Sequence, residues 1–286
     1  MSDILVAFIG GSGLYNIDGI SNIEKININT PFGNTSAPIT IGKLNNSNVA
    51  FLPRHGINHE INPSEIPSKA NIYALKSIGV KKIISLSAVG SLQKEIEPLD
   101  IVIPNQIIDR TKSRPSTFFE NGIVAHISFA EPFCNNLNKL LVKTGKNLNI
   151  NLHQDKTYLA MEGPQFSTKA ESELYRNWGA HIIGMTAIPE SKLAREAEIC
   201  YSTIAMVTDY DCWHETEEDV SVELVIQNLM KNIYSGKKII FEITKLTSLD
   251  YDCECSNALK NAIITNKDSI PKEIKESISL FTNKYL

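Results

Sequence analysis

The amino-acid sequence predicts an α/β protein built in three layers, with helices on both sides of a central sheet. Short apolar runs rich in β-branched residues alternate with segments whose apolar residues recur at helical spacing. Several apolar runs end in loops with glycine and hydroxyl residues, and the run at residues 203–207 leads into two carboxylates, Asp209 and Asp211. Because ligands bind at the carboxyl ends of strands in such sheets, we expect the site to lie there.

Composition and charge exclude several classes of protein. The chain has 286 residues, of which 42% are hydrophobic and 21% are charged, as in one large or two medium globular domains. A net charge of −4 provides no basic patch for nucleic acid, so a bound anion must be held by a few local groups. The N-terminal residues lack the basic region of a signal peptide and are typical of a first strand. We therefore expect a cytoplasmic protein that binds neither membrane nor nucleic acid.

The cysteines do not predict a metal site. There are five of them, their spacing matches no zinc motif, and only Cys253 and Cys255 are close in sequence. These two can form a strained disulfide or act in thiol exchange, and unpaired surface thiols are an equal alternative. The sequence therefore predicts no bound metal.

A candidate phosphate-binding loop follows the first predicted strand, residues 4–9. The glycines of residues 10–13 let a ligand approach the backbone N–H groups, and the hydroxyl of Ser12 adds a donor. The loop lacks the G-x-G-x-x-G spacing of dinucleotide-binding folds, and the segment after it resembles strands instead of a crossover helix. A tight bend without a ligand is the alternative.

An arginine and a histidine stand side by side where a predicted hairpin ends. Arg54 can hold an oxyanion through two donors, and His55 can add a third. A metal site made of His55 and His59 would need helical spacing, which Pro53 and Gly56 disfavour. We rank anion binding first, an exposed loop second and a metal third. The strands expected before this pair are residues 24–29, 37–44 and 48–52.

The middle of the chain continues the alternation of strands and helices. A strand at residues 82–86 leads into Ser87, Ala88 and Gly90, and is the second to end in hydroxyl and glycine residues. The polar stretch 110–122 has no clear period and is predicted to be a lid or an interface loop, with ordinary surface as the alternative. Further strands are expected at residues 101–104, 107–109, 157–161 and 182–185. Helices are expected at residues 68–78, 136–148 and 168–178, from Pro189 onward, and from Asp219 or Ser221 to 244.

The two carboxylates after residues 203–207 are the candidate reactive groups. Because side chains alternate across a strand, Asp209 and Asp211 would face one cavity if the strand geometry persists. Two solvated aspartates in a turn are the alternative for this short motif taken alone. The apolar strand before them, Trp213 after them and the glycine-bearing loops favour a site.

Seven segments of the chain together fit a known pattern. They are Ile-Gly-Gly-Ser-Gly-Leu at residues 9–14, Pro-Arg-His-Gly at 53–56, Ser-Ala-Val-Gly-Ser-Leu at 87–92, His126 with Ala-Glu-Pro-Phe-Cys at 130–134, Met-Glu-Gly-Pro-Gln-Phe-Ser at 161–167, Gly-Met-Thr at 184–186, and residues 205–213. In this order they resemble the trimer-forming purine nucleoside phosphorylase and methylthioadenosine phosphorylase family. The resemblance covers residues 4–244 and implies a single α/β domain with a mixed sheet, the nucleoside phosphorylase fold. We place this catalytic domain at residues 1–249 and a helical tail, outside the resemblance, at 250–286.

The resemblance also implies roles for individual residues. Asp209 would be the acid at N7 of the departing purine, and Asp211 and Ser167 would complete the polar edge that recognises the base. The acid role requires a raised pKa at Asp209, which burial and the like charge of Asp211 would provide. The implied phosphate ligands are Ser12, Arg54, His55, Ser87, the Ala88 amide and Thr186. The implied nucleoside contacts are Phe166 at the purine, Met185 at the ribose, Val225 in the 5′ pocket, and His126 at a neighbouring subunit's ligand.

The implied reaction is phosphorolysis of 5′-methylthioadenosine to adenine and 5-methylthioribose 1-phosphate, in purine and methionine salvage. It is a pentosyl transfer in which phosphate is the co-substrate and no cofactor is needed, and the implied assembly is a homotrimer or a dimer of trimers. One alternative is a phosphorylase of 6-oxopurine nucleosides, which should carry asparagine in place of Asp209. Another is a nucleoside-binding module without turnover. Resembling proteins from hot environments carry a tail cysteine pair, so we expect a redox or stabilising role for Cys253 and Cys255.

Overall fold

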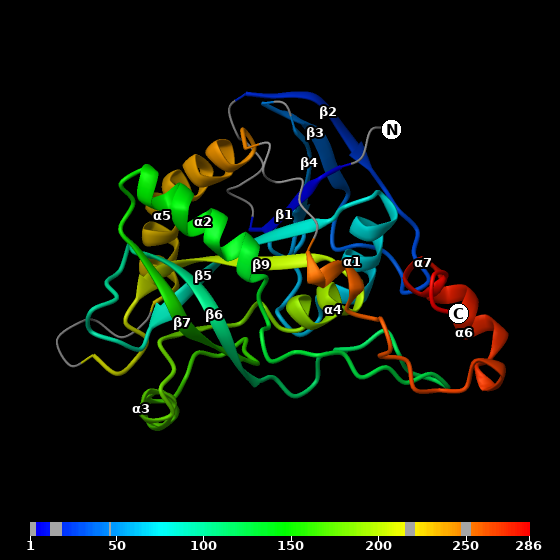
Figure 1. Cartoon of the computed structure of the whole chain (residues 1–286). Coiled ribbons are helices and arrows are strands. Elements are labelled where there is room, and N and C mark those ends of the chain that lie inside the picture. The colour runs from blue at the N-terminus through cyan, green and yellow to red at the C-terminus, as the bar shows by residue number, and fades with distance from the viewer. Residues whose placement is uncertain (1–3, 12–18, 46, 215–220, 247–252) are drawn as a thin grey trace.

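Strands and helices alternate along the chain as the apolar periodicity predicts (Figure 1). The computed structural model describes residues 4–11, 19–45, 47–214, 221–246 and 253–286. The strands in this part of the chain are β1 (Val6–Gly10), β2 (Ile20–Ile26), β3 (Ile39–Leu44), β4 (Ser47–Pro53), β5 (Lys82–Ser91), β6 (Ile101–Arg110), β7 (Leu152–Met161), β8 (Ile182–Gly184) and β9 (Cys200–Asp209). The helices are α1 (Ser68–Ser77), α2 (Asn135–Asn147), α3 (Lys169–Asn177), α4 (Glu190–Glu196), α5 (Val222–Ile243), the 3₁₀ turns η2 (Glu254–Asn257) and η3 (Lys267–Ser269), α6 (Lys272–Ser277) and α7 (Ser279–Thr282).

The central sheet mixes parallel and antiparallel pairs, which confirms the predicted fold class. β1 lies between β4 and β5 and is parallel to both, whereas β2, β3 and β4 form an antiparallel meander. β5 also pairs with both β8 and β9, so the strand order β5-β8-β7-β6-β9 returns to β5 and closes on itself. Every residue of β1 is buried, because this strand is covered on both faces, and it is accordingly a continuous apolar run.

Two hydrophobic clusters, one on each face, make the sheet the middle of three layers. On one face, α2 and α5 pack Leu137, Leu141 and Ile239 against Phe8 and Phe51 of the sheet. On the other face, α1 and α4 pack against the opposite side chains of β1 and β4, together with the C-terminal tail (Figure 1). The chain therefore buries helices on both sides of the sheet, as the alternation of strands and helices predicts.

Local capping signals explain where two helices begin. Thr168 and Glu171 form the predicted capping box at the start of α3, with the Thr168 side chain accepting from the Glu171 backbone. Ser221 is the N-cap of α5 and accepts from the Leu224 backbone, so of the two predicted starts, Asp219 and Ser221, the second is confirmed. The two strands expected at residues 101–104 and 107–109 are one strand, β6, whose pairing with β7 shifts register at Pro104.

The polar stretch at residues 110–122 is anchored in the fold at its centre, so the predicted lid and the alternative of ordinary surface are wrong there, whereas the predicted interface loop stays a prediction. Arg114 is 9% exposed, and its guanidinium donates to four backbone carbonyls, those of Met161, Glu162, Met185 and Ile188. Phe118 and Phe119 are buried in the cluster beneath α1 and α4. The segment lacks a period because a few buried residues anchor it between exposed ones, in neither a helix nor a strand.

The C-terminal tail packs into the fold instead of standing apart from it. Leu259, Ile278 and Phe281 are buried in the same cluster as the α1 and α4 side chains. The Glu198 carboxylate accepts from the Leu259 backbone and from the Tyr285 hydroxyl. The predicted domain boundary, between residues 249 and 250, lies outside the described residues. Among the described helices, every one is too short or too polar to span a bilayer.

Candidate active site

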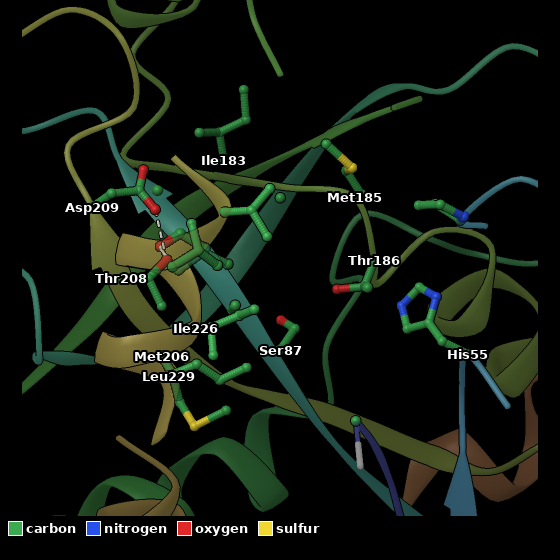
Figure 2. A pocket seen from close by; sticks show the side chains of 18 of the residues that line it. His55, Ser87, Ile183, Met185, Thr186, Met206, Thr208, Asp209, Ile226 and Leu229 are labelled. Atoms are coloured by element: carbon green, nitrogen blue, oxygen red, sulfur yellow. Dashed lines mark hydrogen bonds between the residues drawn. The ribbon is translucent and has the colours of Figure 1, made fainter. Parts of the chain in front are cut away.

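A cavity of about 650 Å³ lies at the carboxyl ends of β4, β5, β8 and β9, beside α5 (Figure 2). Of the residues predicted for the site, those that line it are Arg54, His55, Ser87, Ala88, Phe166, Met185, Thr186, Asp209, Asp211 and Val225. Ser167 and His126 do not line it, and Ser12 lies outside the described residues. Segments far apart in sequence thus meet at one edge of the sheet.

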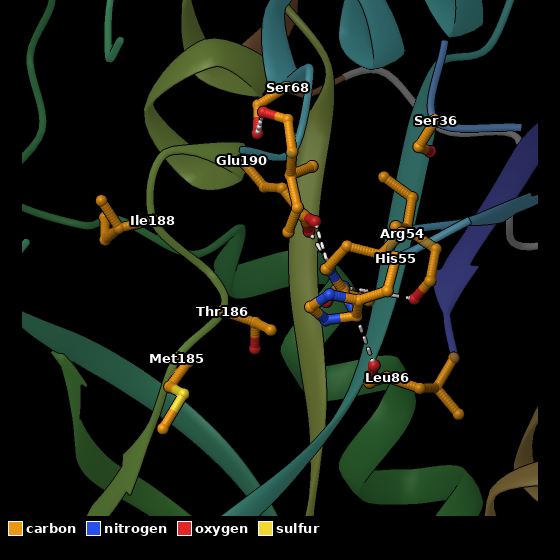
Figure 3. A network of polar contacts seen from close by, with 12 residues as sticks. Ser36, Arg54, His55, Ser68, Leu86, Met185, Thr186, Ile188 and Glu190 are labelled. Atoms are coloured by element: carbon orange, nitrogen blue, oxygen red, sulfur yellow. Dashed lines mark hydrogen bonds and ion pairs between the residues drawn. The ribbon is translucent and has the colours of Figure 1, made fainter. Parts of the chain in front are cut away.

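Arg54 is held by an acidic residue that the sequence reasoning missed. Its Nε and Nη2 lie 2.5 and 3.1 Å from the two carboxylate oxygens of Glu190, the first residue of α4 (Figure 3). Nη2 also donates to Ser85 Oγ at 2.6 Å, and Nη1 donates to the Leu86 carbonyl at 3.1 Å. Glu190 therefore occupies the two-donor edge that we expected an anion to take. These bonds leave one Nη1 hydrogen without an acceptor among the described residues.

The same ion pair decides the charge of Glu190. Both side chains are almost fully buried, with side-chain exposures of 2% for Arg54 and 6% for Glu190. Burial alone would raise the pKa of Glu190, but the charge and hydrogen bonds of Arg54 lower it below its usual value. The Tyr201 hydroxyl donates to the same carboxylate at 2.9 Å. Arg54 is thereby fixed at the cavity wall by a fully bonded partner.

His55 does not present the third donor that we expected at the cavity. Its Nδ1 lies 2.8 Å from the carbonyl oxygen of Ile61, which can only accept, so Nδ1 carries the proton. Burial and the neighbouring Arg54 charge lower the pKa of His55 to about 4, so the ring is neutral at physiological pH. Nε2 is then an acceptor. It suits the hydroxyl of a protonated oxyanion rather than a bare anionic oxygen.

Two hydroxyl groups lie near His55 on the same side of the cavity. Ser87 is 5% exposed, and its Oγ has no hydrogen-bond partner of normal geometry among the described residues. A buried polar group left unpaired costs about 1–3 kcal/mol, so this hydroxyl is set up to receive a ligand. Thr186 Oγ1 lies 3.1 Å from the Tyr158 hydroxyl and next to His55 (Figure 2). These groups and the Ala88 backbone form a polar end of the cavity.

Asp209 lies on the opposite side of the cavity, at the last residue of β9 (Figure 2). Burial raises the pKa of its carboxyl group, with a smaller contribution from the charge of Asp211. Its Oδ2 is 2.6 Å from Thr208 Oγ1, which is also 3.2 Å from the Val89 carbonyl. Thr208 donates this hydrogen bond to the Asp209 carboxyl group, so it orients that group and opposes part of the effect of burial on its pKa.

A glycine on the neighbouring strand makes room for this acid. Gly90 of β5 pairs with Asp209 of β9, and a Cβ atom at Gly90 would lie 2.8 Å from Asp209 Oδ1. The same Oδ1 accepts from the Asp211 backbone N–H at 2.8 Å. Any larger residue at position 90 would displace the carboxyl group.

Asp211 reaches the cavity by a different route from the one predicted. It lies beyond the end of β9 with a φ of 52°, a left-handed conformation, so strand alternation does not direct its side chain. It is 7% exposed, lines the same cavity as Asp209, and has its pKa raised by burial. Both carboxylates thus line one cavity as expected, although the strand geometry on which that expectation was conditioned ends at Asp209.

The rest of the cavity wall is apolar. α5 contributes Val225, Ile226 and Leu229, and Phe166 and Ile183 lie on other parts of the wall. Ser167 is one residue from this wall. Its Oγ is 3.7 Å from the Met161 sulfur, and its carbonyl accepts from the Cys212 thiol at 3.3 Å.

His126 stands on the surface, away from the cavity. It is exposed, and its backbone N–H donates to the Ala262 carbonyl of the tail. Its implied role at a neighbouring subunit's ligand requires a second copy of the chain.

Three functional groups escaped the sequence reasoning. Glu190 resembled an ordinary first-turn acid, Arg114 lay in a stretch without a period, and Thr208 stood inside an apolar strand. Only the last carried a local signal, since a hydroxyl directly before Asp209 can bond its carboxyl group.

Comparison with known proteins agrees with this geometry. Residues 5–244 match the family model of the phosphorylase superfamily. The chain belongs to the phosphorylase superfamily, and its fold is the nucleoside phosphorylase fold.

Individual relatives are more specific than the superfamily. The chain is 51% identical, over 97% of its length and 90% of the relative, to an S-methyl-5′-thioadenosine phosphorylase of Prochlorococcus marinus. It is 50% identical to that of Thermosynechococcus vestitus, over 98% of this chain and 99% of the relative. The family model ends at residue 244, as the motifs predict, whereas the similarity to these individual relatives also extends into the tail.

Solved structures give the same result. A methylthioadenosine phosphorylase from an Antarctic soil metagenomic library is 47% identical, with a TM-score of 0.93, covering 98% of this chain and 99% of that one. The Schistosoma mansoni methylthioadenosine phosphorylase, solved in complex with adenine, is 31% identical with a TM-score of 0.83, covering 98% of both chains.

Proposed function

We propose that this chain catalyses the phosphorolysis of 5′-methylthioadenosine to adenine and 5-methylthioribose 1-phosphate, a pentosyl transfer. One observation carries the proposal: a single cavity has a buried carboxyl group of raised pKa on one side and a cluster of buried hydroxyl, imidazole and guanidinium groups on the other. Cleavage of an N-glycosidic bond needs an acid for the leaving base and an anionic nucleophile at the sugar. The cavity provides a place for each.

The phosphate is the nucleophile and lies among His55, Ser87, Thr186 and the Ala88 amide. Ser87 Oγ is buried at this end of the cavity and supplies a donor, and His55 Nε2 accepts the hydroxyl of a protonated phosphate. Arg54 provides positive charge and one remaining N–H, and Ser12 follows the strand β1 that pairs with β4. Donors placed in this way before the reaction are each worth about 10²–10³ in rate.

The leaving adenine is protonated by Asp209. Negative charge develops on the purine as the bond to the ribose breaks, and transfer of a proton from Asp209 to N7 neutralises it. Burial raises the pKa of Asp209, the direction that a general acid requires, and Thr208 and the Asp211 backbone orient the carboxyl group. Asp211 completes the polar edge around the base, and Phe166 packs on its face. Ser167 would join this edge only if its hydroxyl turned from the Met161 sulfur towards the cavity.

The apolar wall of α5 accounts for the substrate. The Met185 backbone contacts the ribose hydroxyls, and Val225 and Leu229 offer hydrocarbon surface where a 5′-methylthio group would lie. A 5′-hydroxyl would lose its hydrogen bonds to water against such a wall. The reaction needs no cofactor besides phosphate as the co-substrate, and we place it in purine and methionine salvage in the cytoplasm.

We also infer that the enzyme works as a homotrimer or a dimer of trimers. The outer face of α5 carries Val222, Ile226, Met230 and Tyr234 at helical spacing, all more than half exposed. This apolar stripe lies beside the cavity, so a second subunit placed on it would cover the substrate and could present its His126 to the 5′ end.

The direct test is an HPLC assay of methylthioadenosine, adenosine and inosine, each with and without phosphate. We expect phosphate-dependent release of free adenine from methylthioadenosine, with inosine the poorest substrate. A preference for inosine would establish the 6-oxopurine alternative instead. Adenine release without phosphate would indicate a hydrolase, and tight binding without any release would indicate a nucleoside-binding module.

A further inference from the structure

Four of the five cysteines meet at one place, far from the cavity. Cys134 is the N-cap of α2, Cys200 is the first residue of β9, and Cys253 and Cys255 belong to the tail. Their sulfur atoms all lie within 4.8 Å of one another, and three of the four residues are buried. Because β9 runs from Cys200 to Asp209, the cluster lies at the opposite end of this strand from the proposed acid.

The sulfur spacing fits a shared metal ion better than pairwise disulfides. Cys134 Sγ and Cys253 Sγ are 3.6 Å apart, and none of the five cysteines forms a disulfide. Four thiolates placed tetrahedrally at about 2.3 Å from a zinc ion lie roughly 3.8 Å from one another. Two disulfides would instead bring the sulfurs together two by two, to about 2.05 Å within each pair. All four sulfurs gather around one point.

Groups beside the cluster suit metal-bound sulfur. Cys134 is the N-cap of α2, so its sulfur lies at the N-terminus of a helix of 13 residues. A helix N-terminus of this kind stabilises a thiolate. The side-chain amide of Asn136 approaches Cys253 Sγ at 3.9 Å, as an N–H group does beside a metal-bound sulfur.

We propose that Cys134, Cys200, Cys253 and Cys255 bind one zinc ion, which fastens the C-terminal tail to the catalytic domain. Zn²⁺ displaces the four thiol protons to solvent, forms four Zn–S bonds and leaves a site of net charge −2, without any change of oxidation state. Two ligands come from the domain and two from the tail, so the ion closes a tertiary contact rather than a local loop. A closed tetrathiolate site is structural, because it leaves no open position for substrate.

The proposal is tested on the full chain, purified without chelators and without a metal-binding tag. We expect inductively coupled plasma mass spectrometry to find one zinc ion per chain, and chelation followed by added Zn²⁺ to lower and then restore the melting temperature. Cys255→Ser should lose the bound zinc. The matched control is Cys212→Ser, which removes the one cysteine outside the cluster and should keep it.

A second measurement does not depend on a variant that folds. The wild-type chain loaded with Co²⁺ in place of zinc should show the visible absorption of a tetrahedral thiolate site. A chain that takes up neither metal and whose intact mass shows lost hydrogens has disulfides at this place, which overturns the proposal. Stoichiometric iron with strong visible colour, or equal zinc in wild type and Cys255→Ser, overturns it as well.

Discussion

Glu190 accepts hydrogen bonds from Arg54 Nε and Nη2 through its two carboxylate oxygens, at 2.5 and 3.1 Å. The two residues are 136 positions apart in sequence. Both side chains are removed from water, so each depends on the other to compensate its charge. The sequence presents Arg54 as a free anion ligand, whereas the structure holds its guanidinium in place through Glu190. Its proposed contribution to phosphate binding can therefore be separated from its contribution to stability.

Arg54→Ala should lose most of the activity, and it should weaken the binding of phosphate far more than the binding of the nucleoside. It should also cost about 3–5 kcal/mol of unfolding free energy, because Glu190 is left as an uncompensated buried charge. Arg54→Ala with Glu190→Gln should regain much of that stability and none of the phosphate affinity. Phosphate KM and chemical denaturation, measured on all three proteins, separate the two effects. A single variant whose phosphate KM and kcat stay near wild type would show that Arg54 does not serve the anion.

Asp209→Asn should lower methylthioadenosine turnover by about 10²–10⁴, the usual contribution of a general acid. The amide can donate to O6 of a 6-oxopurine but cannot deliver a proton, so the ratio of inosine to methylthioadenosine activity should rise. Inosine itself should remain poor, since Asp211 still presents an acceptor to O6 and the 5′ pocket is apolar. The measurement is kcat/KM for both nucleosides at saturating phosphate. Turnover near wild type in this variant would move the acid role to Asp211 or to a water molecule.

The pH dependence of the wild type follows from the raised pKa of Asp209. The acid form is the active one, so kcat/KM should fall as the pH rises through that pKa, and Asp209→Asn should lack this limb. The free energy of unfolding depends on pH in the same direction. The stability that Asp209 contributes is present below the ordinary aspartate pKa and is lost as the pH rises through the raised pKa. Opposite slopes in the two proteins would contradict the assignment.

His55 should make the fold sensitive to mild acid. Its pKa is lowered to about 4 in the folded chain, so between that pH and the ordinary histidine pKa the unfolded chain binds a proton that the folded chain does not. Stability should fall as the pH drops from the ordinary histidine value towards 4, by up to roughly 3 kcal/mol. His55→Gln should flatten this dependence. The same substitution at the exposed His126 is the control and should keep the wild-type slope, as urea denaturation at several pH values can show.

Phe281→Ala should destabilise the protein by about 3–5 kcal/mol while leaving the chemistry intact at low temperature. The ring is 3% exposed and packs on Phe118 at 4.5 Å between centroids, so its removal opens a cavity in the core. Ile264→Ala, at a tail residue that is 64% exposed, should change stability by no more than about 0.5 kcal/mol. Equal effects of the two substitutions would mean that the tail does not contribute to the core. Deletion of the whole tail should be far more damaging than the sequence alone suggests.

Element types were predictable because their signals are local. The capping box at Thr168 and Glu171, the N-cap at Ser221 and the apolar run of β1 each depend on neighbours within a few residues. Asp209 was predictable for the same reason, since a carboxyl group at the end of a buried strand must enter the site. The two strands expected on either side of Pro104 were wrong because pairing with β7 bridges the interruption.

Local pattern thus indicated the strands, the helices, the loops that line the cavity and the carboxyl group that we propose as its acid. Tertiary packing decided which groups those residues meet. Glu190 reaches Arg54 because α4 and β4 pack in the same hydrophobic cluster. Four cysteines whose spacing matches no zinc motif converge because the tail folds back onto the start of α2 and of β9. Such pairings join residues whose separation in sequence carries no period. They arise only when burial of the two faces of the sheet brings distant segments together.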